Sequence, residues 1–174
     1  VATTPGGGWL VAAVIWPVIA VLLAIVAGGR HAARIALVSM PVGLAVAAAI
    51  AVRVWPGGEA LVYLVGGWAP PLGIALRADG LSVAMMLTTG IVITGAGLFA
   101  HADFAPQPGE PETRTSLVFW VLLIAVWGAM NLVVMSHDLF NLYVALELLT
   151  FAAVPPERQR KVLVLGVLGA IVLR

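Results

Sequence analysis

Long apolar runs separated by short polar segments dominate the chain. A helix that spans the hydrocarbon core of a bilayer needs about 17 to 25 mostly apolar residues. The pattern predicts six membrane helices, at residues 9–27, 35–52, 81–100, 117–135, 139–154 and 162–173. The sixth run would cover only roughly 18 Å of a core near 30 Å, so we expect it to be truncated. The prediction is an all-α integral membrane protein, with residues 1–174 forming a single membrane domain.

The segment between the second and third predicted helices has a different pattern. Residues 61–65 and 72–76 are short apolar runs on either side of a Gly/Pro-rich turn. Two strand-like runs around such a turn are typical of a β-hairpin. Trp55, Tyr63 and Trp68 suit the aromatic belt at a membrane interface. We therefore expect a short hairpin on the membrane surface.

Two prolines lie in the first two predicted helices. Pro17 is in the middle of the first, where a kink is tolerated if a neighbouring helix covers the carbonyl that the proline leaves unbonded. Pro41 is expected near the first turn of the second helix. Gly28 and Gly29 suit the end of the first helix.

Composition supports the membrane class and excludes several others. Hydrophobic residues make up 62% of the chain and charged residues 10%, whereas soluble domains have about half and a quarter. The net charge of +1, with no dense basic cluster, argues against a nucleic-acid partner. There is no cysteine, and the three histidines are scattered, so no metal site is expected. No phosphate-binding or nucleophile motif appears, and we expect no cofactor.

Basic residues predict the orientation. If the spans alternate, the loops after the first, third and fifth share one side of the membrane. Those loops hold Arg30, Arg34, Arg114, Arg158, Arg160 and Lys161, against Arg53 and Arg77 on the other side. Basic loops favour the inner side. The prediction is a multi-pass protein of the inner (plasma) membrane with its N-terminus outside.

Glu147 is the one acid well inside an apolar segment. It lies nine residues beyond Asp138, or about 13 Å along a helix, close to the bilayer midplane. A charge there costs on the order of 2.5 to 3.5 kcal/mol, so the carboxylate must face the bundle, pair with a cation or bind a proton. A carboxyl that switches between the last two states can relay protons. The alternative is a protonated side chain that only hydrogen-bonds a neighbouring helix.

Other polar residues near Glu147 are candidate supporting groups: Asp138, Tyr143, Asn131, Asn141 and Thr150. Tyr143 and Thr150 share a helix face with Glu147, and we expect that polar face to turn inward. For both, and for Asn131 and Asn141, ordinary hydrogen bonds between helices are the favoured interpretation. Asp138 suits the N-cap of the fifth helix, and a role in proton exit is the alternative.

Residues 136–149 resemble the signature of the D subunit of multi-subunit (Mrp-type) sodium/proton antiporters. The matching sequence is Ser-His-Asp-Leu-Phe-Asn-Leu-Tyr-Val-Ala-Leu-Glu-Leu-Leu. Residues 66–74 and 79–82 are similar to the family's segment before its third helix, and the resemblance extends over about residues 9–154. Related subunits occur in respiratory complex I and in membrane-bound hydrogenases.

The resemblance implies a role for Glu147 as the family's fifth-helix glutamate, which modulates a buried lysine on a later helix during proton translocation. It also implies an outside N-terminus. Family members have about fourteen helices, whereas this chain stops within its sixth and its only lysine, Lys161, is in a loop. The expectation is an N-terminal fragment of a larger antiporter-like subunit that is not active alone.

The leading functional prediction is a membrane subunit of a proton-translocating cation/proton antiporter complex. It would be a transporter subunit more than an enzyme. Its partners would be other subunits of the complex, the lipid bilayer, protons and Na⁺. One alternative is a membrane-arm subunit of an NADH–quinone oxidoreductase or membrane hydrogenase. Another is a structural or assembly protein that transports nothing.

Overall fold

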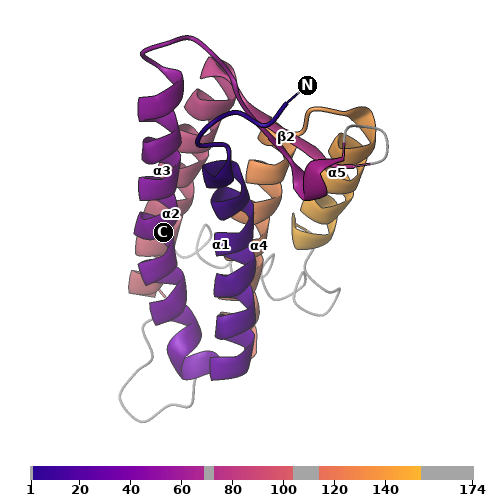
Figure 1. The fold of residues 1–174 in the computed structure, drawn as a ribbon. Helices are drawn as coiled ribbons and strands as arrows, with labels where there is room; N and C mark the ends of the chain where they lie inside the picture. Colours follow the sequence, from indigo (N-terminus) through magenta and orange to yellow (C-terminus); the bar gives the residue numbers. More distant parts are fainter. Residues whose placement is uncertain (1, 69–72, 104–113, 154–174) are drawn as a thin grey trace, which may run out of the picture.

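Five helices form the bundle that the computed structural model describes over residues 2–68, 73–103 and 114–153 (Figure 1). They are α1 (Gly8–Ala27), α2 (Gly29–Val54), α3 (Gly80–Asp103), α4 (Arg114–Met135) and α5 (Leu139–Ala153). The first four are long and apolar enough to cross a membrane, and α5 is a shorter apolar helix. The mostly helical membrane fold is thus confirmed. The predicted span 162–173 lies outside the described residues, so the count of six stays a prediction.

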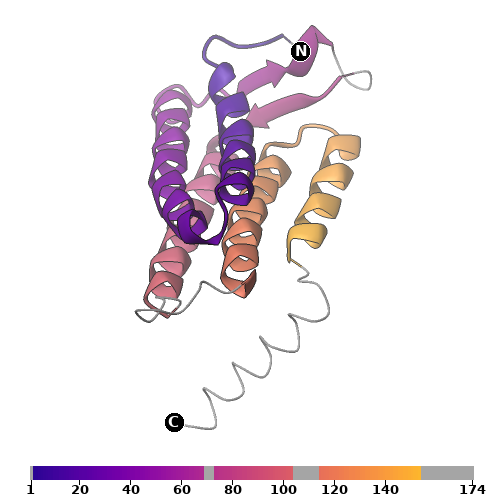
Figure 2. The same cartoon turned by 90° about the horizontal axis from the view of Figure 1, so that it is seen from below.

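Successive helices run in opposite directions, so the helix starts alternate between the two ends of the bundle (Figures 1 and 2). The N-terminal residues and the segment between α2 and α3 lie at one end, which we call the hairpin end. The connection between α1 and α2 lies at the other, the turn end. The predicted orientation assumed that successive spans cross the membrane in alternate directions, and the arrangement of the described helices agrees with that assumption.

The predicted hairpin is present. Strand β1 (Leu61–Leu64) pairs antiparallel with β2 (Ala75–Ala78), and Leu61 lies opposite Ala78. The second strand begins three residues later than the predicted run 72–76. Gly66 and Gly67 both have a positive φ, which only glycine adopts readily, and they start the turn.

The hairpin is fixed to the rest of the chain at both of its edges. On the β1 side, the Thr4 N–H donates to the Val62 carbonyl at 2.9 Å, and the Val62 N–H donates to Thr4 Oγ1 at 2.9 Å. On the β2 side, Leu76 forms a bridge with Ser136, which precedes α5. The hairpin therefore joins the start of the chain to the start of its fifth helix.

The connection between α1 and α2 is a single residue, Gly28, with φ of +77°. Its N–H donates to the Ala24 carbonyl at 3.2 Å, so the predicted helix end at this glycine is confirmed. Helix α2 begins at Gly29, six residues before the predicted start, because its first turns carry polar residues that an apolar pattern leaves out. Pro41 therefore lies in the middle of α2, and its predicted place in the first turn is wrong.

The turn-end half of the bundle packs around two fully buried tryptophans of α4, Trp120 and Trp127. The Trp127 ring occupies the space in which Gly43 of α2 would carry a Cβ. Gly97 of α3 packs in the same way on Met40 of α2. Small residues that let helices approach closely are typical of membrane bundles.

Large apolar side chains remain exposed on the outer faces of the helices. Examples are Val26 of α1 at 86% exposed, Phe99 of α3 at 71% and Phe151 of α5 at 77%. A soluble domain of this size does not leave so many apolar side chains in water. These faces fit lipid or further protein as their surroundings.

Candidate functional site

Helix α5 begins where it does because Asp138 caps it. Asp138 Oδ1 accepts a hydrogen bond from the Asn141 N–H at 2.7 Å. The Asp138 carbonyl accepts from the Leu142 N–H at 3.0 Å. A side chain that satisfies one of the free amides at a helix start is the defining feature of an N-cap. The predicted N-cap role of Asp138 is confirmed.

Strand β2 fixes the residues just before this cap. The His137 N–H donates to the Ala75 carbonyl at 3.3 Å, next to the bridge between Ser136 and Leu76. The start of α5 is therefore bound to the hairpin as well as to α4.

The two faces of α5 have different surroundings. Asn141, Ala145 and Ala152 are buried on the face that packs against α4. Glu147 follows Ala145 by two residues, which places it roughly 200° further around the helix. Glu147 is exposed, as are Tyr143 and Thr150. The expectation that this polar face turns toward the other helices is wrong for the part of the chain that the structure describes.

Glu147 has a hydrogen-bond partner one turn away on its own helix. Tyr143 Oη donates to Glu147 Oε1 at 2.7 Å. Thr150 Oγ1 donates to the Leu146 carbonyl at 2.9 Å. Both hydroxyls bond within α5, so the expected bonds from Tyr143 and Thr150 to other helices are absent from the described residues. Of these two hydroxyls, only that of Tyr143 contacts the carboxylate.

The surface around Glu147 is apolar. Phe140 and Phe151 on α5 are 72% and 77% exposed, and Leu146 is 46% exposed. Helix α5 contains no Lys or Arg that could neutralise the carboxylate. Lys161, the chain's one lysine, lies outside the described residues. The Tyr143–Glu147 pair is thus a polar group on an apolar surface that has no cation on its own helix.

Asn131 in α4 makes the expected bond between helices. Its Nδ2 donates to the Ala13 carbonyl of α1 at 3.1 Å, and its side chain is buried. Pro17 stands four residues after Ala13 and has no N–H, so it cannot donate the helical hydrogen bond that this carbonyl would normally accept. Asn131 supplies the missing donor. The sequence indicated the need for a donor at Pro17 but did not identify which residue provides it.

Asn141 does not make the bond predicted for it. Its side chain is 3% exposed, yet its Nδ2 has no partner within the described part of the chain. Asp138 Oδ2 is likewise buried without a partner there. The N-terminal end of α5 therefore holds one donor and one acceptor that no described residue satisfies.

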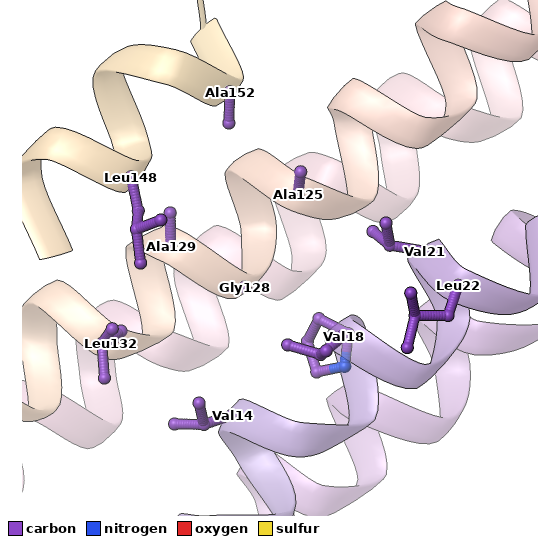
Figure 3. A pocket seen from close by; sticks show the side chains of 11 residues that line it. Val14, Val18, Val21, Leu22, Ala125, Gly128, Ala129, Leu132, Leu148 and Ala152 are labelled. Atoms are coloured by element: carbon purple, nitrogen blue, oxygen red, sulfur yellow. The ribbon is translucent and has the colours of Figure 1, made fainter. Parts of the chain in front are cut away.

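An apolar groove of about 230 Å³ separates α5 from α1 (Figure 3). Leu148 and Ala152 of α5 line one wall, and Val14 and Val18 of α1 line the other. Gly128 and its α4 neighbours form the floor. Helix α5 therefore packs against α4, and the groove separates its other flank from α1.

The start of α3 carries a second capped helix end. Asp79 Oδ1 accepts from the Ser82 N–H at 3.0 Å and from the Leu81 N–H at 3.1 Å. The Ser82 backbone hydrogen bond, the largest of several causes, holds the pKa of the Asp79 carboxyl below its ordinary value. Sequence reasoning gave no role to this residue, although an Asp directly before an apolar helical run is a typical N-cap signal.

Metal binding has no support in the described ranges 2–68, 73–103 and 114–153. They contain no group of three or more His, Cys, Asp or Glu side chains that could hold an ion.

Known proteins similar to the chain include antiporter and respiratory subunits. It is 37% identical over 91 residues to the D subunit of the Na⁺/H⁺ antiporter of Bacillus subtilis, a match to 51% of the chain and 17% of the relative. It is 33% identical over 96 residues to the N subunit of the NADH-quinone oxidoreductase of Desulforudis audaxviator, covering 55% and 18%. A putative antiporter subunit mnhD2 of Staphylococcus aureus is 34% identical over 88 residues, covering 51% and 16%. No family model matches the chain.

Solved structures that share the fold include chains of two membrane complexes. A chain of the Mrp complex from Dietzia sp. has a TM-score of 0.68 at 23% identity, covering 84% of this chain and 26% of its own. A chain of the membrane-bound sulfane sulfur reductase, an archaeal respiratory membrane complex, has a TM-score of 0.70 at 21% identity, covering 83% and 29%. The matches span less than one fifth of the length of the curated relatives. Over the 88 to 96 residues that match, the chain is a homologue of the D subunit of Na⁺/H⁺ antiporters and of the N subunit of NADH-quinone oxidoreductases.

Proposed function

We propose that the chain is a portion of a membrane subunit in a cation/proton antiporter complex, and that Glu147 carries the proton. One observation supports this most directly. Glu147 lies among exposed apolar side chains of α5, accepts a hydrogen bond from Tyr143, and is not covered by the helices described here. Relatives with matching segments include a Na⁺/H⁺ antiporter subunit and a putative antiporter subunit.

The chemistry follows from the position of the carboxylate. In an apolar environment the charged form of Glu147 needs a cation nearby, and the protonated form needs none. Tyr143 can donate its hydroxyl hydrogen to the carboxylate, and it can accept a hydrogen bond from the protonated acid. A cation that approaches and withdraws on a neighbouring helix would therefore make Glu147 release and bind one proton in turn.

The cation has to come from outside α5. The chain matches less than one fifth of the curated relatives' length, so further helices of a longer subunit, or other subunits, are available to supply it. In this proposal the chain is a single membrane domain within a multi-subunit assembly of the inner (plasma) membrane. Its N-terminus is outside, as the distribution of arginines favours. The transported ions are protons and Na⁺.

The test is Glu147→Gln in the complete complex, reconstituted in vesicles. Glutamine keeps an acceptor for Tyr143 but binds no proton, so Na⁺-driven proton flux should be lost. Glu59→Gln is the matched control, because Glu59 is exposed in the loop before β1 and lies outside the helices. Tyr143→Phe should reduce the flux less than Glu147→Gln. Unchanged flux in an assembled Glu147→Gln complex would show that the proposal is wrong and favour a structural or assembly role.

The similarity to the N subunit of an NADH-quinone oxidoreductase favours a second candidate, a membrane-arm subunit of such an enzyme. Affinity purification of the chain from its native membrane distinguishes the two. Co-purified NADH oxidation activity supports the oxidoreductase. Antiporter subunits without that activity support the first proposal.

A further inference from the structure

A second apolar groove, of about 270 Å³, runs along the seam between α1 and α2, away from α5. It lies in the turn-end half of the bundle. Its lining comprises Trp16, Ile19, Ala20, Leu23, Arg34, Ile35, Val38 and Ser39. On α1 the lining extends from Trp16 to Leu23, or roughly 10 Å at 1.5 Å per residue.

The groove arises because small residues lie between larger ones. Ala20 and Ser39 are buried at its floor. Ile19 and Leu23 on one rim and Val38 on the other are between 41% and 67% exposed. A strip of space flanked by branched apolar side chains fits a hydrocarbon chain.

The polar groups of the floor already have hydrogen-bond partners. Trp16 Nε1 donates to the Ser39 carbonyl at 2.9 Å. Ser39 Oγ donates to the Ala36 carbonyl at 2.8 Å. The apolar part of the groove therefore offers an occupant no free hydrogen-bonding group, and a polar occupant would lose its own bonds there.

Arg34 is the one charged residue that lines this groove. It lies in the second turn of α2, close to the Gly28 connection, and its side chain is exposed. Neither α1 nor α2 contains an Asp or Glu, so the two walls of the groove carry nothing that neutralises the guanidinium. A permanently charged guanidinium at the membrane-boundary end of an apolar groove is complementary to an anionic phosphate, which it can bind through two parallel hydrogen bonds.

We propose that the α1–α2 groove binds one acyl chain of an anionic phospholipid whose phosphate is held by Arg34. The apolar strip takes the hydrocarbon, and the arginine at its end selects the charge of the headgroup. Lipid fits better than a packed helix, because the rims carry bulky Ile, Leu and Val side chains, whereas the close contacts between membrane helices are enriched in small ones.

The test is native mass spectrometry of the complete complex, purified in the presence of phosphatidylglycerol or phosphatidylcholine. Wild-type protein should retain more phosphatidylglycerol. Arg34→Gln should lower that retention about fivefold, the effect of one basic residue at a membrane surface, and Arg34→Lys should keep part of it. Arg53→Gln is the matched control at the other end of α2, where Arg53 Nη1 donates to the Ala49 carbonyl and its guanidinium lies 5.0 Å from the Trp9 ring centroid.

A second pair of variants tests the apolar part of the site. Val38→Trp should fill the groove from its rim and lower lipid retention, while Val52→Trp, on an equally exposed part of α2 outside the groove, should not. Equal retention of both lipids, or equal effects of Arg34→Gln and Arg53→Gln, would overturn the proposal. So would cross-linking of Val38→Cys to a protein subunit, which is readily detected because the chain has no other cysteine. Lipid retention is measured without transport, so this outcome is independent of the role of Glu147.

Discussion

Asn131 and Ala13 lie 118 residues apart in the sequence and are joined by a 3.1 Å hydrogen bond from the Asn131 side chain to the Ala13 carbonyl. The bond exists because Pro17 cannot donate to that carbonyl. The asparagine of α4 therefore compensates for the proline of α1. It joins the two helices at the position where α1 lacks a backbone hydrogen bond.

This pairing predicts a coupling between Asn131 and Pro17. Asn131→Leu should lower the free energy of unfolding in detergent by about 1 kcal/mol, the scale of a hydrogen bond between membrane helices. Pro17→Ala restores a backbone N–H at position 17, which can donate to the Ala13 carbonyl. The loss caused by Asn131→Leu should then be smaller. A double-mutant cycle measures the difference, and an equal loss in both backgrounds would contradict the proposed coupling.

The contact between Gly43 and Trp127 predicts a sharp difference between two chemically identical substitutions. Gly43→Ala places a Cβ that overlaps the edge of the Trp127 ring and should destabilise the bundle by about 1 to 3 kcal/mol, as overpacking does. Gly95→Ala is the control, since nothing lies within 4 Å of the added Cβ. It should be neutral or slightly stabilising. Unfolding in micelles measures both, and equal effects would show that α2 and α4 do not approach so closely.

The cap at Asp138 predicts that its hydrogen-bond acceptor matters more than its charge. Asp138→Asn keeps an acceptor for the Asn141 N–H, and it breaks no other bond, because Asp138 Oδ2 has no described partner. Asp138→Ala removes the acceptor and should destabilise the start of α5 by about 1 kcal/mol. Hydrogen exchange of the α5 amides should rise in the alanine variant only. If Asp138→Asn leaves α5 intact but lowers antiport, Asp138 takes part in proton exit.

Asp79 predicts how stability depends on pH. Its pKa is lower in the folded protein than its ordinary value of 3.8, so the folded state favours the charged form. The resulting stabilisation is complete above the ordinary pKa and is lost as the pH falls through the lower, folded value. Unfolding measured between about pH 5 and about pH 2 should show this loss. Asp79→Asn should reduce it, and an unchanged profile would contradict the cap.

The apolar pattern predicts most of the helices well, because a segment that crosses lipid must be a long run of mostly apolar residues. The predicted ranges 9–27 and 117–135 differ from α1 and α4 by at most three residues at either end. The start of α2 does not follow from the pattern, since Arg30, His31 and Arg34 belong to the helix although they are polar. Backbone hydrogen bonding, which apolar patterning does not reveal, determines where a helix ends.

The surroundings of individual polar side chains are harder to predict. Periodicity places Tyr143, Glu147 and Thr150 on one face, and they do share one. It does not say whether that face contacts this chain, another subunit or lipid. A helix of this chain, a helix of another subunit and lipid are all apolar neighbours, and each favours the same apolar residues on the helix that faces it. For the same reason the bond made by Asn131 could be expected, while the absence of a described partner for Asn141 could not.

The hairpin also has a consequence for the order in which the molecule forms. Thr4 bonds to Val62 of β1, which lies 58 residues later in the sequence. His137 bonds to Ala75 of β2, which lies 62 residues earlier. One small sheet therefore contacts both ends of the stretch 4–137. During synthesis α1 and α2 can pair early, since one glycine joins them. Strands β1 and β2 can also pair early, but the β2 edge cannot make its contacts with Ser136 and His137 until the ribosome has released the residues before α5. We therefore expect the bond from His137 to β2 to form late in co-translational assembly, and we expect a nascent chain stalled before that point to leave the β2 edge open to non-native partners.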